Sequence, residues 1–330
     1  MLEEKVNLES NVNDLVGSEL DLGIGLDAVS DTLVRYWCEA FEDSNRRYWQ
    51  DTLTVAPPGL ITSVCRLPYW PTDPSADQRG LIGVVGDALN RPESVVQKVD
   101  FTFDRDLRIG DHVRCVEKVL SVSPEKTTKI ATGNFVRLER RYLDAAGDVI
   151  GVAELDFFKY ARDPQRTAIP VAVETETGRP VRTTSRERGG IVHPVREDIA
   201  GLTVGAELAP MTWVLNVTRM VQMAYISRDF NPVHHDLEYA QANGLKNMLV
   251  QWGCYVGIFG RYLGHEVGPG ARMTRIQFTM LRPLYAGETA TVSGKVVVIE
   301  TGDSSTSIEF ELAVSDSHGV TTPARVWIEQ

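Results

Sequence analysis

The chain repeats itself, and this repetition constrains its fold more than any other feature. Asp100–Asp111 aligns without gaps on Gln277–Glu288, and Thr32–Asp43 aligns on Thr218–Asp229. Self-similarity of this kind is typical of a fold that uses one structural unit more than once. We therefore expect two copies of one unit in tandem.

The composition between the copies marks the domain boundaries. Residues 163–198 are polar, rich in Thr and Arg, and interrupted by Pro and Gly, which is typical of a crossover linker. We expect residues 1–162 and 199–330 to be the two units. Within the first unit, residues 68–98 are a long insertion where a central helix is expected. Long loops are often functional lids, and a loop packed on the surface fits equally well.

Both copies contain segments with strand patterns. Apolar and polar residues alternate in four of them, which favours half-buried antiparallel strands. They are Phe135–Tyr142, Val149–Tyr160, Ala290–Ile299 and Ser307–Val314. This predicts an α+β fold with two antiparallel sheets, each wrapped around its own helix.

The helix of the second copy is predicted from the apolar stretch Met248–Leu263. Its glycines lie along one helical stripe: Gly253, Gly257, Gly260 and Gly264. An interior glycine costs about 1 kcal/mol relative to alanine, so the stripe needs an offsetting gain. The simplest is a close approach of the helix backbone to a sheet. The first glycine can also contact substrate, while packing alone accounts for the others.

An acid and an imidazole stand five residues apart in the second copy. Asp229 follows a predicted helix that Thr218 would cap, Asn231-Pro232 turns the chain, and His234 can point back toward the carboxylate. In the first copy Asn45 aligns on Asn231, but Tyr48 replaces the histidine. Because Tyr titrates near pH 10 and His near 6.5, the first copy cannot transfer protons in the same way at neutral pH.

Such a pair suits the addition of water to a C=C bond. One group can take a proton from water while a proton is delivered to the neighbouring atom. The other interpretation is an ordinary Asx turn with a packed histidine. The downstream segment favours chemistry, because Asp236 is placed to cap a short helix, Leu237–Asn243, which Gly244 ends. The predicted glycine-bearing helix then follows.

These residues together resemble the MaoC-like (R)-specific enoyl-CoA hydratase family. The matching motifs are Asp229–Asp236, Glu238-Tyr239-Ala240, Gly244-Leu245 and Arg282–Glu288. The resemblance implies a double hotdog fold and syn addition of water to a trans-2-enoyl thioester by Asp229 and His234. It implies that Asn231 positions the loop. The first copy is similar to the degenerate half of double-hotdog dehydratases, which shapes the acyl tunnel.

The chain departs from the family pattern at two places. Arg228 stands where the family has glycine, so its bulk or charge can alter the site entrance. Gln251 is followed by Trp252 before Gly253, so the amide that receives the thioester oxygen is that of Trp252 or that of Gly253. Arg228 and Gln251 are therefore candidates for substrate binding.

Charge and cysteine content narrow the function classes. The formal net charge of −11 disfavours nucleic acid as a partner. An anionic acyl-CoA then needs a local cationic patch, for which Arg272, Arg275 and Arg282 are candidates, although a solvated strand face is the simpler interpretation. The cysteines are dispersed and form no metal-type pair, and the adjacent His234, His235 and Asp236 diverge, so we expect no metal site.

The sequence therefore predicts an enoyl-CoA hydratase, or the reverse 3-hydroxyacyl-CoA dehydratase, with coenzyme A only as part of the substrate. A thioesterase and a non-catalytic acyl-CoA-binding subunit are the alternatives. The start Met1–Lys5 lacks a signal-peptide pattern and no long apolar run occurs, so we expect a cytoplasmic protein without membrane contact. We expect a monomer or a homodimer of double hotdogs. The acyl group and the physiological direction do not follow from the sequence.

Overall fold

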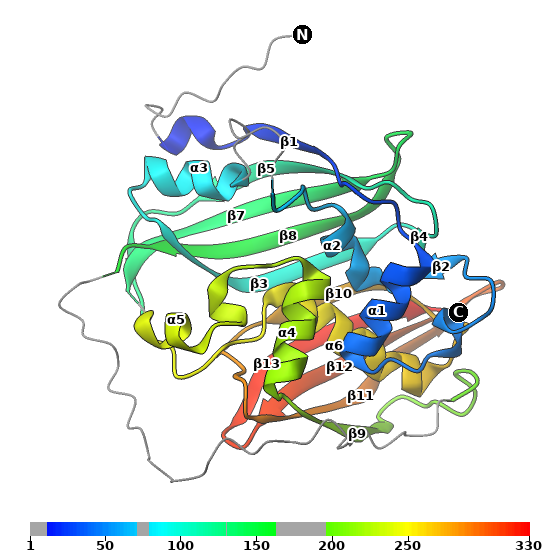
Figure 1. Ribbon diagram of the computed structural model, residues 1–330. Coiled ribbons are helices and arrows are strands. Elements are labelled where there is room, and N and C mark those ends of the chain that lie inside the picture. The colour runs from blue at the N-terminus through cyan, green and yellow to red at the C-terminus, as the bar shows by residue number, and fades with distance from the viewer. Residues whose placement is uncertain (1–11, 71–78, 130, 163–195) are drawn as a thin grey trace.

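The computed structural model describes residues 12–70, 79–129, 131–162 and 196–330 (Figure 1). The first half of the chain, up to residue 162, contains η1 Val12–Leu15, β1 Glu19–Ile24, α1 Asp31–Phe41, η2 Arg46–Tyr48, β2 Val55–Ala56, η3 Pro58–Leu60, α2 Ile61–Val64, α3 Gly80–Ala88, β3 Glu93–Phe103, β4 Leu107–Arg108, β5 Arg114–Val122, β6 Lys126–Thr127, β7 Thr132–Leu143 and β8 Val149–Tyr160.

The second half follows the same plan with fewer short elements. It contains β9 Glu207–Val214, α4 Val217–Ser227, η4 Pro232–His234, α5 Leu237–Ala242, α6 Trp252–Val267, β10 Arg272–Thr279, β11 Thr289–Thr301, β12 Thr306–Asp316 and β13 Gly319–Glu329. The four strands expected from alternation are all present. One has the expected bounds and the other three are longer. Helix α6 begins at Trp252, within the apolar stretch from which it was predicted, and ends four residues beyond that stretch, at Val267.

The long strands form a single antiparallel sheet. Its order is β1-β5-β7-β8-β3-β10-β13-β12-β11-β9, while β6 pairs with β7 off this path and β2 pairs with β4 separately. Counted inward from either edge, the two halves have corresponding strands in the same order. The two sheets expected from the sequence are therefore present and are joined edge to edge into one. Figure 1 shows this sheet behind helices α1, α4 and α6.

The two halves join where β3 pairs with β10. Asp100 of β3 lies directly opposite Gln277 of β10, the residue with which it aligns in the sequence. Because a residue faces its own counterpart only on a two-fold axis, an approximate axis passes through this pair. The carboxylate of Asp100 accepts hydrogen bonds from Gln277 at 2.6 Å and from Arg275 at 2.7 and 2.9 Å.

The glycine stripe of α6 faces the first half of the chain rather than a sheet. All residues of α6 except Gly260 are buried. A Cβ on Gly257 would come within 2.7 Å of the Phe41 ring of α1, and one on Gly264 within 2.9 Å of the Asn45 amide. The glycines therefore permit the two halves to approach closely, which corrects the expected approach to strands.

The predicted insertion at residues 68–98 is mostly regular structure. Helix α3 packs on β1 and β5, and strand β3 begins at Glu93. The carboxylate of Glu117 accepts a hydrogen bond from the Leu81 amide at 2.7 Å, which holds the start of α3. An uninterrupted loop is therefore a wrong prediction. Residues 71–78 and most of the predicted linker, 163–195, lie outside the described residues.

Candidate active site

Helix α4 leads directly into the turn that carries Asp229 and His234. Its N-cap is Asn216, whose side chain accepts a hydrogen bond from the Arg219 amide at 2.9 Å. The corresponding cap of α1 is Ser30. The predicted threonine caps are therefore wrong by two residues. Both helices end two residues before the aspartate of their turn.

The residue before Asp229 has a left-handed backbone. Arg228 has φ 53° and ψ 28° and forms the C-cap of α4. This conformation favours glycine, which explains the family preference that this chain departs from. The Arg228 guanidinium lies 3.6 Å from Asp27 of the first half. Arg228 thus contributes to a contact between the halves, and its role in binding substrate stays a prediction.

Asn231 fixes the path of the chain between the acid and the imidazole. Its side-chain oxygen accepts a hydrogen bond from the Val233 amide at 3.3 Å, and its own amide donates to Asp229 Oδ1 at 3.3 Å. One oxygen of the carboxylate is thereby held by the turn. The other oxygen, Oδ2, is the one that side chains approach.

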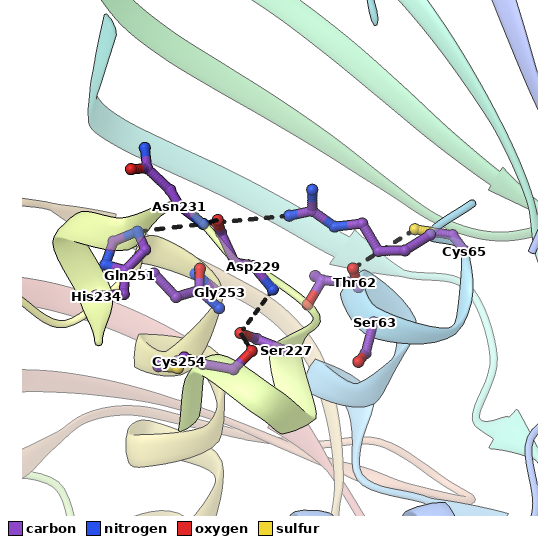
Figure 2. A network of polar contacts seen from close by, with 12 residues as sticks. Thr62, Ser63, Cys65, Ser227, Asp229, Asn231, His234, Gln251, Gly253 and Cys254 are labelled. Carbon is purple, nitrogen blue, oxygen red and sulfur yellow. Dashed lines mark hydrogen bonds and ion pairs between the residues drawn. The ribbon is translucent and has the colours of Figure 1, made fainter. Parts of the chain in front are cut away.

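The structure brings Asp229 and His234 together. Asp229 Oδ2 lies 4.0 Å from His234 Nε2, and Figure 2 shows the two side chains facing one another. His234 Nδ1 lies 2.8 Å from the Leu249 carbonyl oxygen. A carbonyl can only accept, so Nδ1 carries the hydrogen and Nε2 of the neutral ring presents its lone pair toward Asp229.

Burial also favours the neutral imidazole. The side chain of His234 is only 11% exposed. Burial lowers the pKa of His234 below its ordinary value, and the charges of His235 and Arg66 act in the same direction, whereas Asp229 and the Leu249 carbonyl oppose it. Nε2 is therefore available as a proton acceptor near neutral pH.

The first turn of α6 lies beside this pair. Gln251 is the N-cap of α6, and its side-chain oxygen accepts a hydrogen bond from the Gly253 amide at 2.6 Å. The Gly253 amide is therefore occupied by Gln251 and would need that side chain to turn away before it could receive a thioester oxygen. Trp252, the first residue of α6, is the other predicted donor and is buried.

The first half contributes side chains to this region that the sequence did not reveal. A Cβ on Gly253 would come within 3.1 Å of Thr62 Oγ1. Arg66 Nη2 lies 3.7 Å from Asp229 Oδ2. A cavity of about 190 Å³ beside the turn is lined by Arg66, Ile226 and Phe230, among others. No motif connects these side chains with the second turn, and only the packing of α2 against α4 and of η3 against α6 brings them near it.

The three arginines expected to meet coenzyme A each form an ion pair. Arg272 pairs with Glu329 at 2.9 Å, and Arg282 pairs with Asp316 through two bonds of 2.6 Å. Arg275 is held by Asp100 in the junction between the halves. Arg282 lies beyond the end of β10. These contacts agree with the alternative of a charged strand face, and phosphate binding by these residues stays a prediction.

The other histidines of this region have separate environments. His265 is 4% exposed within α6 and lies 3.1 Å from Ser44 Oγ. His235 Nε2 lies 3.3 Å from the Phe230 carbonyl oxygen. Within the described ranges no group of three His, Cys, Asp or Glu residues could hold a metal ion. Among the same described residues, no helix has both the length and the apolar character needed to cross a membrane.

The turn of the first half has the same hydrogen bonds. The Asn45 amide donates to Asp43 Oδ1 at 2.9 Å, and Asn45 Oδ1 accepts from the Arg47 amide at 3.0 Å. Glu42, which precedes Asp43, has φ 53°. A cavity of about 50 Å³ adjoins Asp43 and Tyr48. The sequence alignment of the two turns is therefore matched by their backbone geometry.

Similarity to known proteins agrees with this geometry. A family model of the MaoC-like domain matches residues 202–317. The 3-oxo-4,17-pregnadiene-20-carboxyl-CoA hydratase beta subunit of Mycobacterium tuberculosis is 35% identical over 99 residues, which are 30% of this chain and 77% of that protein. The chain belongs to the MaoC-like family. This confirms the family resemblance that the motifs indicated.

Two further comparisons cover larger shares of this chain. A protein named "Probable enoyl-CoA hydratase alpha subunit" from Thermomonospora curvata is 28% identical over 154 residues, 43% of this chain and 48% of that protein. The matched region thus spans about half the length of that relative. A solved MaoC-like dehydratase has a TM-score of 0.71 at 17% identity, covering 96% of this chain and 98% of the other.

The comparisons also confirm the fold class. A conserved protein of Mycobacterium tuberculosis described as having a double hotdog fold has a TM-score of 0.61 at 15% identity. The aligned region covers 97% of this chain and 98% of that protein's chain. The MaoC-like chain is therefore an α+β double hotdog, whose two hotdog units share one continuous sheet.

Proposed function

We propose that this MaoC-like protein adds water to the C=C bond of a trans-2-enoyl-CoA thioester, or removes water from the corresponding 3-hydroxyacyl-CoA. The Asp229–His234 pair carries this proposal. At 4.0 Å apart, Asp229 Oδ2 and His234 Nε2 are too distant for a direct hydrogen bond. Both are acceptors, and the two O–H groups of one water molecule can donate to them together.

In the proposed step, the water oxygen attacks Cβ of the enoyl group. His234 Nε2 takes one proton from the water as the new C–O bond forms, and the electron pair of the C=C bond moves to the thioester oxygen. The negative charge of Asp229 stabilises the imidazolium. The same proton then returns from Nε2 to Cα, so H and OH add to one face and the imidazole is restored to its neutral form.

The thioester oxygen needs a hydrogen-bond donor while it carries the negative charge. The first turn of α6 offers amide groups there, and those of Trp252 and Gly253 are the two candidates. The Gly253 amide would act after release from Gln251. Acid–base groups and these amides suffice for the reaction, so the proposal includes no metal or redox cofactor. Coenzyme A enters as part of the substrate, and the number of subunits stays open.

The test is hydration of crotonyl-CoA and of bulkier enoyl-CoA thioesters. The reaction is monitored by the loss of the enoyl absorbance, and the product is then identified. Wild type should give the 3-hydroxyacyl-CoA, and His234→Ala should lose roughly 100- to 10,000-fold in kcat, the range of general acid–base catalysis. Release of free coenzyme A thiol instead would indicate a thioesterase. Binding of enoyl-CoA without turnover across the substrate series would contradict catalysis.

A further inference from the structure

A short segment of the first half contacts the catalytic turn of the second half at three places. Before the turn, Ser63 Oγ donates a hydrogen bond to the carbonyl oxygen of Ile226, near the end of α4. Within the turn, Arg66 reaches the Asp229 carboxylate. At the next residue of the turn, the Tyr69 ring packs edge-on against Phe230 with 5.0 Å between ring centroids. The segment 63–69 therefore lies along the end of α4 and the start of the turn.

Arg66 is placed to control the reactive oxygen of Asp229. Asp229 Oδ1 already accepts a hydrogen bond from the Asn231 amide at 3.3 Å. Arg66 Nη2 and His234 Nε2 approach Oδ2, at 3.7 and 4.0 Å. A guanidinium on one side and an imidazole on the other thus fix where Oδ2 points. The side chains of Arg66 and Asp229 are 35% and 21% exposed, so solvent screens this contact only in part.

The position of Arg66 depends on the fold of the first half. It follows α2 directly, and α2 packs against α4 while η3, just before it, packs against α6. The α2 backbone is further held where the Arg66 amide donates to the Ser63 carbonyl at 3.1 Å. The guanidinium therefore reaches the carboxylate from the end of a segment, η3 and α2, whose two parts pack on α6 and on α4.

We propose that Arg66 is a positioning residue for Asp229, so that the half whose turn lacks a histidine completes the active site of the other half. The expected change in reaction rate rests on the proposed hydration reaction. The expected effect of the Arg66 charge on the Asp229–His234 pair does not rest on it. The charged groups that face His234 are Asp229, His235 and Arg66, and the last of these comes from the first half.

The experiment compares Arg66→Met, Arg66→Lys and a matched control, Arg137→Met. Arg137 also pairs with an aspartate, Asp156, at 2.7 Å, but on strands β7 and β8 away from the turn. Arg66→Met should lower kcat on an enoyl-CoA by roughly 10- to 100-fold, the scale of a displaced catalytic group. Arg66→Lys should restore most of the activity, and Arg137→Met should behave as wild type.

A second measurement does not depend on turnover. In a histidine NMR titration, the pKa of His234 should rise in Arg66→Met, because a positive charge that lowers it has been removed. It should be unchanged in Arg137→Met. Thermal unfolding shows whether both variants fold equally well.

Three results would overturn the role of Arg66. They are an unchanged His234 titration in Arg66→Met, an unchanged kcat with a raised KM, and the same losses in Arg137→Met. If wild type hydrates no thioester, the proposed reaction fails, and the His234 titration alone then decides whether Arg66 acts on the pair.

Discussion

The two turns of the molecule share a backbone and differ in chemistry. In both, an aspartate follows a left-handed residue and an asparagine two positions later accepts a hydrogen bond from the backbone. His234 ends one turn, and the buried Tyr48 ends the other. Because the turn without an imidazole keeps these bonds, the Asp-x-Asn turn is a feature of the fold. Catalysis needs the histidine in addition.

The environments of the two acids differ as much as their partners. Asp43 is 4% exposed and sits beside Tyr48, whose pKa burial raises well above its ordinary value. Burial also raises the pKa of Asp43 to about 6. Asp229, by contrast, has a side chain that is 21% exposed and meets two nitrogen groups, on His234 and Arg66. The comparison predicts that Asp229 is reactive and that Asp43 only destabilises the folded state.

The largest expected effect separates the two acids by activity. Asp229→Asn removes the charge that orients water and stabilises the imidazolium, and should lower kcat by roughly 100- to 10,000-fold. Asp43→Asn changes the equivalent atom of the other turn and should leave kcat within about twofold, an effect too small to count as catalysis. Initial rates on one enoyl-CoA decide between them. Equal losses in both variants would mean that both turns are catalytic.

The pH dependence of the rate should follow the second turn alone. Neutral His234 is the reactive form and burial lowers its pKa, so activity should be constant around pH 7 and decline only below pH 6.5, by about tenfold per pH unit once the imidazole is protonated. Tyr48→Phe should leave this profile unchanged. A decline that begins above pH 7 would show that His234 is not the base, or is not buried during turnover.

Most of the fold and the central pair could be predicted from the sequence. The repeat predicts two equal units, and the spacing of Asp229 and His234 around Asn231-Pro232 places them together. The edge-to-edge junction at Asp100 and Gln277 could not be predicted. The alternation of apolar and polar residues in a strand does not indicate which strand pairs with it. The threonine caps failed since Ser30 and Asn216 are equally good caps two residues upstream.

Arg66 was missed for a different physical reason. It lies in the half that lacks the histidine and far from Asp229 in the sequence, so no local pattern connects them. Only the packing of α2 against α4 brings the guanidinium to the carboxylate. Cross-unit contacts of this kind follow from the approximate two-fold arrangement and not from any motif.

The packing of α6 against the first half gives the next prediction. Gly257→Ala would place a Cβ 2.7 Å from the Phe41 ring, and should destabilise the protein by about 1–3 kcal/mol, as overpacking does. Gly260→Ala meets only Met273 at 3.9 Å and should be neutral or gain up to about 1 kcal/mol from helix propensity. Urea unfolding of both variants measures the difference. A Gly257→Ala variant as stable as wild type would show that the halves can separate slightly.

An effect of similar size on stability concerns the buried acid of the first turn. The folded-state pKa of Asp43, about 6, exceeds its unfolded value near 4, so the folded protein binds more protons between these values and loses stability as pH rises through them. The cost is therefore complete at pH 7 and absent at pH 4. Asp43→Asn removes it and still accepts the Asn45 hydrogen bond, so it should stabilise at pH 7 by up to about 3 kcal/mol and have little effect at pH 4.

Unfolding in urea at both pH values measures this gain, with the exposed Asp51→Asn as control. The control substitution should change the free energy of unfolding little at either pH, because an exposed carboxylate stays hydrated in the folded protein. If Asp43→Asn instead destabilises at pH 7, the buried charge is held favourably, and the Asn45 backbone amide and Arg261 are the groups that lower its pKa. The first turn would then use its carboxylate to fasten α6, much as the second turn uses Arg66, and the two halves would be more alike in electrostatics than their exposures indicate.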